Sequence, residues 1–347
     1  AGQRESDSRS RTAGGGQVRA RRAWRAAAGA AALVLGIGAA PAAAAGLRPT
    51  WTVAVVDQAS RRVLVLGPER PTALSLPGGP DRRTVLWSWS ADTAPDLADL
   101  APGRTWALPD EAKSRVRHGR RYLVTTASGG LAAVVDTTTG ATAWAVDTGS
   151  ANPHSAELLP DGNVAVAASG GGWVRLYAAS LGPRSTAYAE YRLPGAHGVQ
   201  WDARTRRLWA LGDDTLTALR VGGTSAAPTL TAERSVPLPE HGGHDLAPVL
   251  ASPGRFWVST AAHLWRFDPP TDRFTRIRLA DERAERDIKS VGDEPGTGRL
   301  LTAAPDHAGP CTWCTSVLTL HRPDGVRYLP GAQLYKARWW TSWGSGA

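Results

Sequence analysis

A short motif recurs six times along this 347-residue chain at a nearly constant spacing, and that period constrains the fold more than any other feature. Successive copies are separated by 41, 43, 47, 45 and 47 residues when they are aligned on one column. The aligned column consists of Lys113, His154, His197, His244, Lys289 and Lys336. A repeat of about 40–50 residues is typical of the four-stranded blades of a propeller, so the sequence predicts six blades.

Each repeat also reads as a set of short strands separated by turns. In the third and clearest repeat, strands are expected at 154–159, 164–168, 173–177 and 188–192. The first repeat has three expected strands and no preceding motif, whereas the last motif, at 334–340, has no strands after it. We therefore predict an all-β, six-bladed β-propeller whose ring is closed by the C-terminal strand joining the first blade, which removes a free sheet edge.

The first 45 residues resemble an export signal more than a part of the repeats. They contain seven Arg against two acidic residues, then an Ala-rich apolar run at 26–40 and an Ala-Ala-Ala sequence at 43–45. This order is typical of a cleaved secretory signal peptide, and the apolar run is shorter than the ~20 residues of a membrane-spanning helix. We expect 1–45 to be a signal peptide and 46–347 to be one propeller domain of a secreted protein.

The export route is open between two types. Residues 21–24, Arg-Arg-Ala-Trp, resemble a twin-arginine signal, and plain Sec export is the alternative. Without 1–45, the formal charge of +9 falls to +4, and no long basic block or aromatic-basic stripe is left. This composition argues against a nucleic-acid partner. We expect a monomer that has no stable association with a membrane after signal cleavage.

The aligned column of the repeats contains the main candidate residues for a functional site. Only three of the 40 basic residues are Lys, and all three, Lys113, Lys289 and Lys336, are in this column. Inner strands of a propeller line its central channel, so we expect the column to converge there at one level. The imidazoles of His154, His197 and His244 are candidate ligands of one divalent metal, Mn, Zn or Ca.

Such a site suggests a metal-dependent lyase. Crowding of ammonium groups lowers their pKa values, so the three Lys are candidate catalytic bases that would remove a proton next to a carboxylate, as in β-elimination. Two alternatives stay open. The ring is also suited to binding an anionic small molecule or extracellular polysaccharide without catalysis, and the His residues are also consistent with purely structural contacts. Further ligand-binding candidates on the same segments are Glu111, Arg115, Asn152, Asp287 and Arg338.

The two cysteines form one short motif, Cys311-Thr312-Trp313-Cys314. No second pair of cysteines is present to complete a four-thiolate zinc site. In an exported protein, this spacing favours a local disulfide over a redox pair. We therefore predict a Cys311–Cys314 disulfide in the loop between two strands of the sixth blade.

The segments 154–177, 197–211 and 242–249, together with the Cys motif, resemble an uncharacterised family of secreted actinobacterial six-bladed propeller proteins over roughly 51–340. This resemblance implies secretion and the propeller fold. More distantly, the His-Gly and His-Ser-Ala-Glu starts of the repeats resemble propeller lyases of the streptogramin lyase and oligogalacturonate lyase types. That likeness implies channel His residues that serve elimination with a divalent metal, and it extends only to His154, His197 and His244.

Overall fold

A computed structural model describes residues 52–67, 85–307 and 309–341, all of which belong to one compact unit, Arg48–Ala347. Within these ranges, 24 strands form six four-stranded antiparallel sheets. The predicted signal peptide, 1–45, lies outside the described residues. The described ranges contain no helix that is long and apolar enough to cross a membrane.

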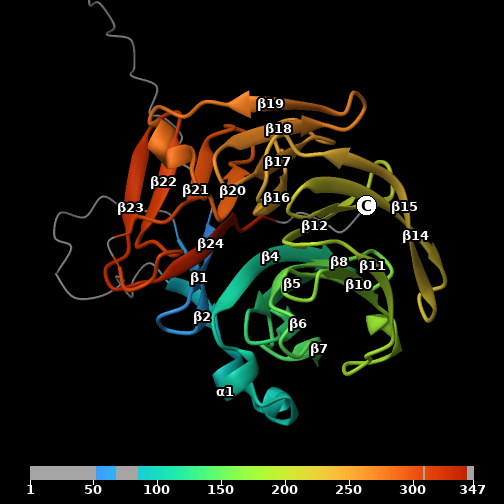
Figure 1. Ribbon diagram of the computed structural model, residues 1–347. Coiled ribbons are helices and arrows are strands. Elements are labelled where there is room, and N and C mark those ends of the chain that lie inside the picture. The colour runs from blue at the N-terminus through green and yellow to red at the C-terminus, as the bar shows by residue number, and fades with distance from the viewer. Residues whose placement is uncertain (1–51, 68–84, 308, 342–347) are drawn as a thin grey trace, which may run out of the picture. The chain divides into compact units, whose positions relative to one another are not determined.

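One strand of each sheet lines a central channel. These inner strands are β4 (Pro109–Arg117), β8 (Pro153–Leu158), β12 (Gly198–Asp202), β16 (Asp245–Pro248), β20 (Ser290–Asp293) and β24 (Leu334–Trp339). Each contacts the inner strands of both neighbouring sheets, so the six close a ring (Figure 1). The predicted six-bladed propeller is confirmed.

The other three positions of each sheet follow outward from the inner strand. The second strands are β5 (Arg120–Ala127), β9 (Val164–Ala168), β13 (Arg207–Leu211), β17 (Phe256–Ser259), β21 (Leu300–Ala303) and β1 (Val53–Asp57). The third strands are β6 (Leu131–Asp136), β10 (Trp173–Tyr177), β14 (Thr215–Gly223), β18 (Leu264–Asp268), β22 (Val317–His321) and β2 (Arg62–Leu66). The outer strands are β7 (Thr142–Asp147), β11 (Tyr188–Arg192), β15 (Pro228–Pro237), β19 (Arg273–Ile277), β23 (Gly325–Tyr328) and β3 (Val85–Trp89).

The C-terminal strand closes the ring as the sequence predicted. Strand β24 pairs with β1 in antiparallel register, with Ala54 opposite Arg338 and Val55 opposite Ala337. The first sheet therefore takes its inner strand from the end of the chain. This pairing satisfies the backbone groups that an open inner edge would expose.

The hydrophobic core lies between neighbouring sheets. Each of the six interfaces has its own cluster of buried apolar side chains. Tryptophans fill several of them: Trp106 packs between the sheets of β1 and β4, Trp144 between those of β4 and β8, and Trp209 between those of β12 and β16. Large aromatic side chains bury much apolar area each, which explains the many tryptophans within the repeats.

Short helices form part of the connections between strands. Between β3 and β4 the chain forms the 3-10 helices η2 (Ala91–Thr93) and η3 (Pro95–Leu100) and then α1 (Pro102–Thr105). Pro95 and Pro102 occupy the first helical positions, where a missing N–H is tolerated. Two more 3-10 helices are η4 (Ala179–Leu181) and η5 (Glu282–Glu285).

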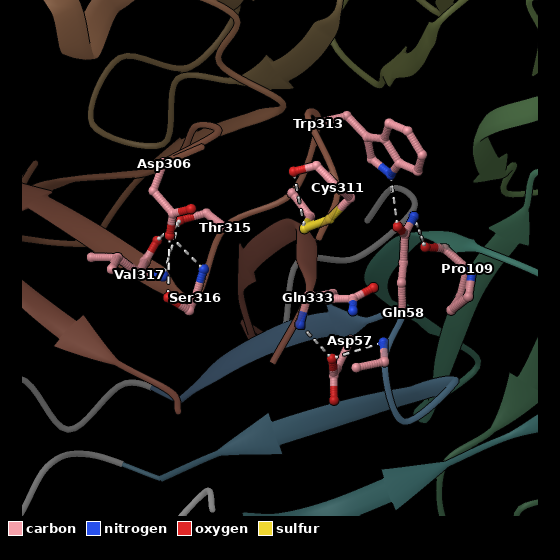
Figure 2. The surroundings of a disulfide bond; sticks show 12 residues. Asp57, Gln58, Pro109, Asp306, Cys311, Trp313, Thr315, Ser316, Val317 and Gln333 are labelled. Carbon is pink, nitrogen blue, oxygen red and sulfur yellow. Dashed lines mark hydrogen bonds between the residues drawn. A yellow bond between two sulfur atoms is a disulfide. The ribbon is translucent and has the colours of Figure 1, made fainter. Parts of the chain in front are cut away.

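The predicted disulfide is present and joins Cys311 to Cys314 in the loop between β21 and β22. Figure 2 shows how this loop contacts the first sheet. The indole Nε1 of Trp313 donates to Gln58 Oε1 at 3.0 Å, and Gln58 Nε2 donates to the carbonyl of Pro109 at 3.1 Å. The disulfide loop is thereby tied to the β1–β2 turn and to the start of β4, near the ring closure.

Candidate ligand-binding channel

Side chains of the inner strands enter the channel at successive levels, because alternate residues of a strand share one face. The first level, here called the imidazole level, consists of Asp110, His154, His197, His244, Lys289 and Tyr335. Asp110 and His154 stand at irregularities in the register of β4 and β8, which aim them at the channel. His197 and His244 directly precede β12 and β16, and their backbone N–H groups bond to the second strands.

Two further levels follow along the inner strands. The carboxylate level consists of Glu111, Ser155, Gly198, Asp245, Ser290 and Lys336. The guanidinium level consists of Lys113, Glu157, Gln200, Ala247, Gly292 and Arg338. Arg115 lies one step beyond the guanidinium level on β4.

The prediction that the whole repeat column shares one level is wrong for Lys113 and Lys336. In the structure, Asp110 and Tyr335 take their places, and the steps between equivalent residues become 44, 43, 47, 45 and 46. The backbone supports this alignment, because the residue two positions earlier has a positive φ in five of the six repeats. These five residues are Leu108, Asn152, Gly195, Gly242 and Asp287.

The imidazole level is a chain of stacked and bonded rings. The rings of His154 and His197 stack with centroids 4.4 Å apart and planes 10° apart, and His244 meets His197 edge-on at 5.3 Å. Tyr335 Oη lies 3.4 Å from His154 Nδ1, within hydrogen-bond distance. Lys289 Nζ lies 3.1 Å from His244 Nε2 and, as an ammonium, donates to it. His244 is therefore a neutral acceptor in this arrangement.

Burial lowers the pKa values of two of these imidazoles. Desolvation, helped by the neighbouring His154, holds the pKa of His197 well below its usual value. Desolvation and the charge of Lys289 lower the pKa of His244 to about 3. Burial also lowers the pKa of Lys289, although the nearby carboxylate of Asp287 opposes this shift. At neutral pH, His197 and His244 are therefore uncharged beside the ammonium of Lys289.

The arrangement does not fit the predicted metal centre. A metal ion lies close to the plane of each imidazole that binds it, and the stacked planes of His154 and His197 cannot share one ion in that way. Among the described residues, no group of three or more His, Cys, Asp or Glu side chains is placed to hold a metal.

The carboxylate level is held by buried ion pairs. Arg338 contacts two carboxylates at once, with Nε 2.9 Å from Glu111 Oε1 and Nη2 2.6 Å from Asp245 Oδ1. Lys336 Nζ lies 3.3 Å from Glu111 Oε2 and donates to the His154 carbonyl at 2.9 Å. Although burial raises it, the charges of Arg338 and Lys336 hold the pKa of Glu111 well below its usual value.

A second cluster of buried ion pairs lies at the guanidinium level. Arg115 forms a bidentate ion pair with Glu157, and both N–O distances are 2.6 Å. Lys113 Nζ lies 3.3 Å from the same carboxylate and donates to Ser155 Oγ at 3.1 Å. Burial lowers the pKa of Lys113 to about 8, even though Glu157 opposes the shift. One carboxylate here therefore serves two cations.

A cavity of about 60 Å³ opens beside this cluster. Its walls include Lys113, Arg115, Gln200 and Arg338, and Arg115 Nη2 donates to Gln200 Oε1 at 3.2 Å. Over the carboxylate and guanidinium levels with Arg115, the buried cations outnumber the buried carboxylates by four to three. The cations are Lys113, Arg115, Lys336 and Arg338, and the carboxylates are Glu111, Glu157 and Asp245. The charged side chains that border the cavity thus belong to a network with an excess of positive charge, whereas Leu250, Val291 and Trp339 make other parts of its wall apolar.

The remaining predicted ligand-binding residues lie ahead of the inner strands. Asp287 is half-exposed, and its Oδ1 is 3.8 Å from His244 Nε2 and 4.0 Å from Lys289 Nζ, so it borders the imidazole level. Asn152 instead donates to Ser169 Oγ at 3.1 Å, and its side-chain oxygen has no hydrogen-bond partner in the described structure. Both have left-handed backbone, which suits Asn and Asp better than most residues.

Sequence reasoning missed several members of the channel. Asp110, Glu157, Gln200, Asp245 and Tyr335 all face it, and two of them provide the carboxylates that Arg115 and Arg338 bind. A signal for the correct alignment was present. Gly, Asn or Asp stands two positions before the channel residue in four repeats, at the position where the backbone needs a positive φ.

The fold resembles solved structures only distantly. The chain is similar to a streptogramin B lyase structure at 13% identity (63% of this chain, 68% of that chain, TM-score 0.44). It is similar to a protein of unknown function from Bacteroides caccae at 11% identity (83% and 98%, TM-score 0.49). A virginiamycin B lyase from Staphylococcus aureus matches at 10% identity (64% and 70%, TM-score 0.43). These scores are below 0.5, so the fold assignment rests on the strand pairing.

No curated protein matches the sequence. A family model, in contrast, matches residues 60–343, which is most of the chain. The protein therefore belongs to the family of unknown function DUF6528.

Proposed function

We propose that this protein is an exported, non-catalytic propeller that binds an acidic group of a small molecule or extracellular polysaccharide at the Arg115 end of its channel. The observation that carries the proposal is the cavity lined by Lys113, Arg115 and Arg338, in a network with one more cation than carboxylates. A bound carboxylate or phosphate would balance that charge. The disulfide supports a location in an oxidising compartment outside the cell.

The size of the cavity favours an acidic group over a whole sugar ring. A volume of about 60 Å³ corresponds to about two water molecules at roughly 30 Å³ each. Planar guanidinium groups recognise carboxylate and phosphate oxygens directionally. The side chains of Arg115 and Arg338 are already fixed by Glu157 and by Glu111, so they would meet an anion with little loss of conformational freedom.

The test is to give the cavity a carboxylate of its own. Gln200→Glu places a charge beside Arg115 without changing the side-chain size, and we expect it to abolish binding of acetate and inorganic phosphate in calorimetric titrations at pH 7 and low salt. The matched control is Gln333→Glu, which adds the same charge away from the cavity. Failure of the unaltered protein to bind either anion, or equal binding by Gln200→Glu, would refute the proposal.

A further inference from the structure

A larger cavity lies away from the channel, between two neighbouring blades. It has a volume of about 600 Å³, within the usual range of small-molecule sites. The β8–β9 turn contributes Pro160 and Asp161 on one side, and the β12–β13 turn with β14 contributes the other side. Its most informative lining residues are Asp161, Trp201, Thr205, Arg206, Arg207 and Arg220.

Two arginines of this cavity occupy positions that are unfavourable for the stability of a sheet. Arg207 of β13 and Arg220 of β14 stand directly opposite each other, and like charges at such positions are destabilising. They share a single carboxylate, that of Glu233, whose Oε1 is 3.3 Å from Arg220 Nε. The register of β14 with β15 shifts beside Glu233. Two cations and one carboxylate leave this pair with a net positive charge.

A third arginine increases this excess. Arg206 is exposed, and its side chain has no hydrogen-bond or ion-pair partner among the residues that the structure describes. Its backbone has a φ of 55°, at the end of a turn in which Asp202 accepts hydrogen bonds from Arg204 N and Thr205 Oγ1. The turn therefore holds a free guanidinium at the edge of the cavity.

The remaining walls favour a ligand that also carries hydroxyl groups. The carboxylate of Asp161 is exposed at the cavity and accepts only from Asn163 of its own turn in the described structure, so it has capacity for further donors. Thr205 adds a hydroxyl oxygen, and the partly buried indole of Trp201 adds an apolar surface. A plain anion would be repelled by Asp161, whereas a sugar hydroxyl would donate to it.

We infer that this inter-blade cavity binds an acidic saccharide. The acidic group contacts Arg206, Arg207 and Arg220, and the hydroxyl groups of the ring bond to Asp161 and Thr205. This site is separate from the channel cavity and does not depend on the function proposed for it.

The probes for this inference are glucuronate, its neutral analogue glucose, and inorganic sulfate, each measured by isothermal titration calorimetry at low salt. We expect glucuronate to bind, and glucose and sulfate each to bind at least about tenfold more weakly. Arg206→Gln should weaken glucuronate binding by about tenfold, because hydrogen bonds to charged groups contribute strongly. Arg273→Gln, an exposed substitution on β19, is the matched control and should change nothing.

A second variant separates binding from structure. Arg220→Gln removes one of two opposed like charges, so we expect weaker glucuronate binding together with an unchanged or higher melting temperature. Gln200→Glu in the channel should leave glucuronate binding at this cavity unchanged. Absence of glucuronate binding, equal binding of sulfate, or full binding by Arg206→Gln would each overturn the inference.

Discussion

The two ends of the channel differ in how their buried ionisable groups are accommodated. Both bury ionisable side chains on the same inner strands. At the imidazole level, desolvation lowers the pKa values of His197 and His244, and the rings remain neutral. At the carboxylate and guanidinium levels, Glu111 and Glu157 are paired with buried cations instead. Burial thus lowers the pKa values of imidazoles at one end of the channel, whereas at the other end buried cations and carboxylates form ion pairs.

This difference matters for stability and for binding. Buried ion pairs contribute little net stability compared with apolar packing, yet the loss of one partner is strongly destabilising. Neutral imidazoles form no ion pairs at pH 7, so they do not carry this risk of leaving a buried charge unpaired. The Arg115 end is therefore rigid and charged, and it is the end at which an anion is expected. The imidazole end is expected to respond to acid instead.

The largest effect should come from breaking the ion pairs of Arg338. Arg338→Met leaves Glu111 and Asp245 buried with Lys336 as their main remaining cation. We expect the free energy of unfolding to fall by about 3–5 kcal/mol, the usual result of removing one partner from a buried pair. Urea denaturation followed by far-ultraviolet circular dichroism measures this change. A loss below about 1 kcal/mol would show that the network is not structurally required.

Acid should act on the opposite end. Since the pKa values of His197 and His244 are lowered in the fold, the unfolded chain binds more protons between its own His pKa of about 6.5 and the folded values. Stability is therefore lost as pH falls below about 6.5, by on the order of 1–2 kcal/mol per histidine at pH 5. The lowered pKa of Glu111 affects stability only below the pKa that this carboxyl has in the unfolded chain. Changes in stability between pH 5 and 7 therefore report on the histidines and not on Glu111.

Urea denaturation of the unaltered protein and of His244→Asn at pH 5, 6 and 7 tests this prediction. The variant should show a flatter dependence on pH. The control is His241→Asn, because Asp214 raises the pKa of the exposed His241 and its effect has the opposite sign. An unchanged slope in His244→Asn would contradict the assignment. The groups that face His244, and that must be kept constant, are His154, His197, Asp245, Asp287, Lys289 and Lys336.

The smallest effect should come from Lys289, the one column lysine that is level with the histidines. Its Nζ lies 4.0 Å from the half-exposed Asp287, and its other contact is to neutral His244. We expect Lys289→Met to change the free energy of unfolding by less than about 1 kcal/mol, because the carboxylate of Asp287 is distant and half-exposed. If Lys289→Met lowered the free energy of unfolding as much as Arg338→Met does in the same urea experiment, the distinction between the two ends of the channel would be wrong.

The fold was predictable because its signals are local and repeated. Turn residues, strand patterns and a period near 45 residues were enough to predict six blades and the closure by β24, and the Cys311–Cys314 spacing was enough for the disulfide. Of the site, the sequence predicted the convergence of His154, His197 and His244 and the presence of Arg115 and Arg338 in the channel.

The pairing within the site was not predictable in the same way. Lys113 appears in the same column as the histidines, yet it lies two levels away beside Glu157. Bulges in β4, β8 and β24 shift the register by a residue or more, and the sequence does not mark where an extra residue is accommodated. A shift of one residue reverses the direction in which every later side chain points.

By itself, the sequence determined the number of blades, the order of the strands and the kinds of side chain available to the channel, since these depend on residues close together in the chain. Only the tertiary structure decided which carboxylate lies beside which cation, because Arg338 and Glu111 are 227 positions apart and meet only after the ring closes. Charge state followed from that closure, since burial and the distance to a counter-charge set the pKa of each group.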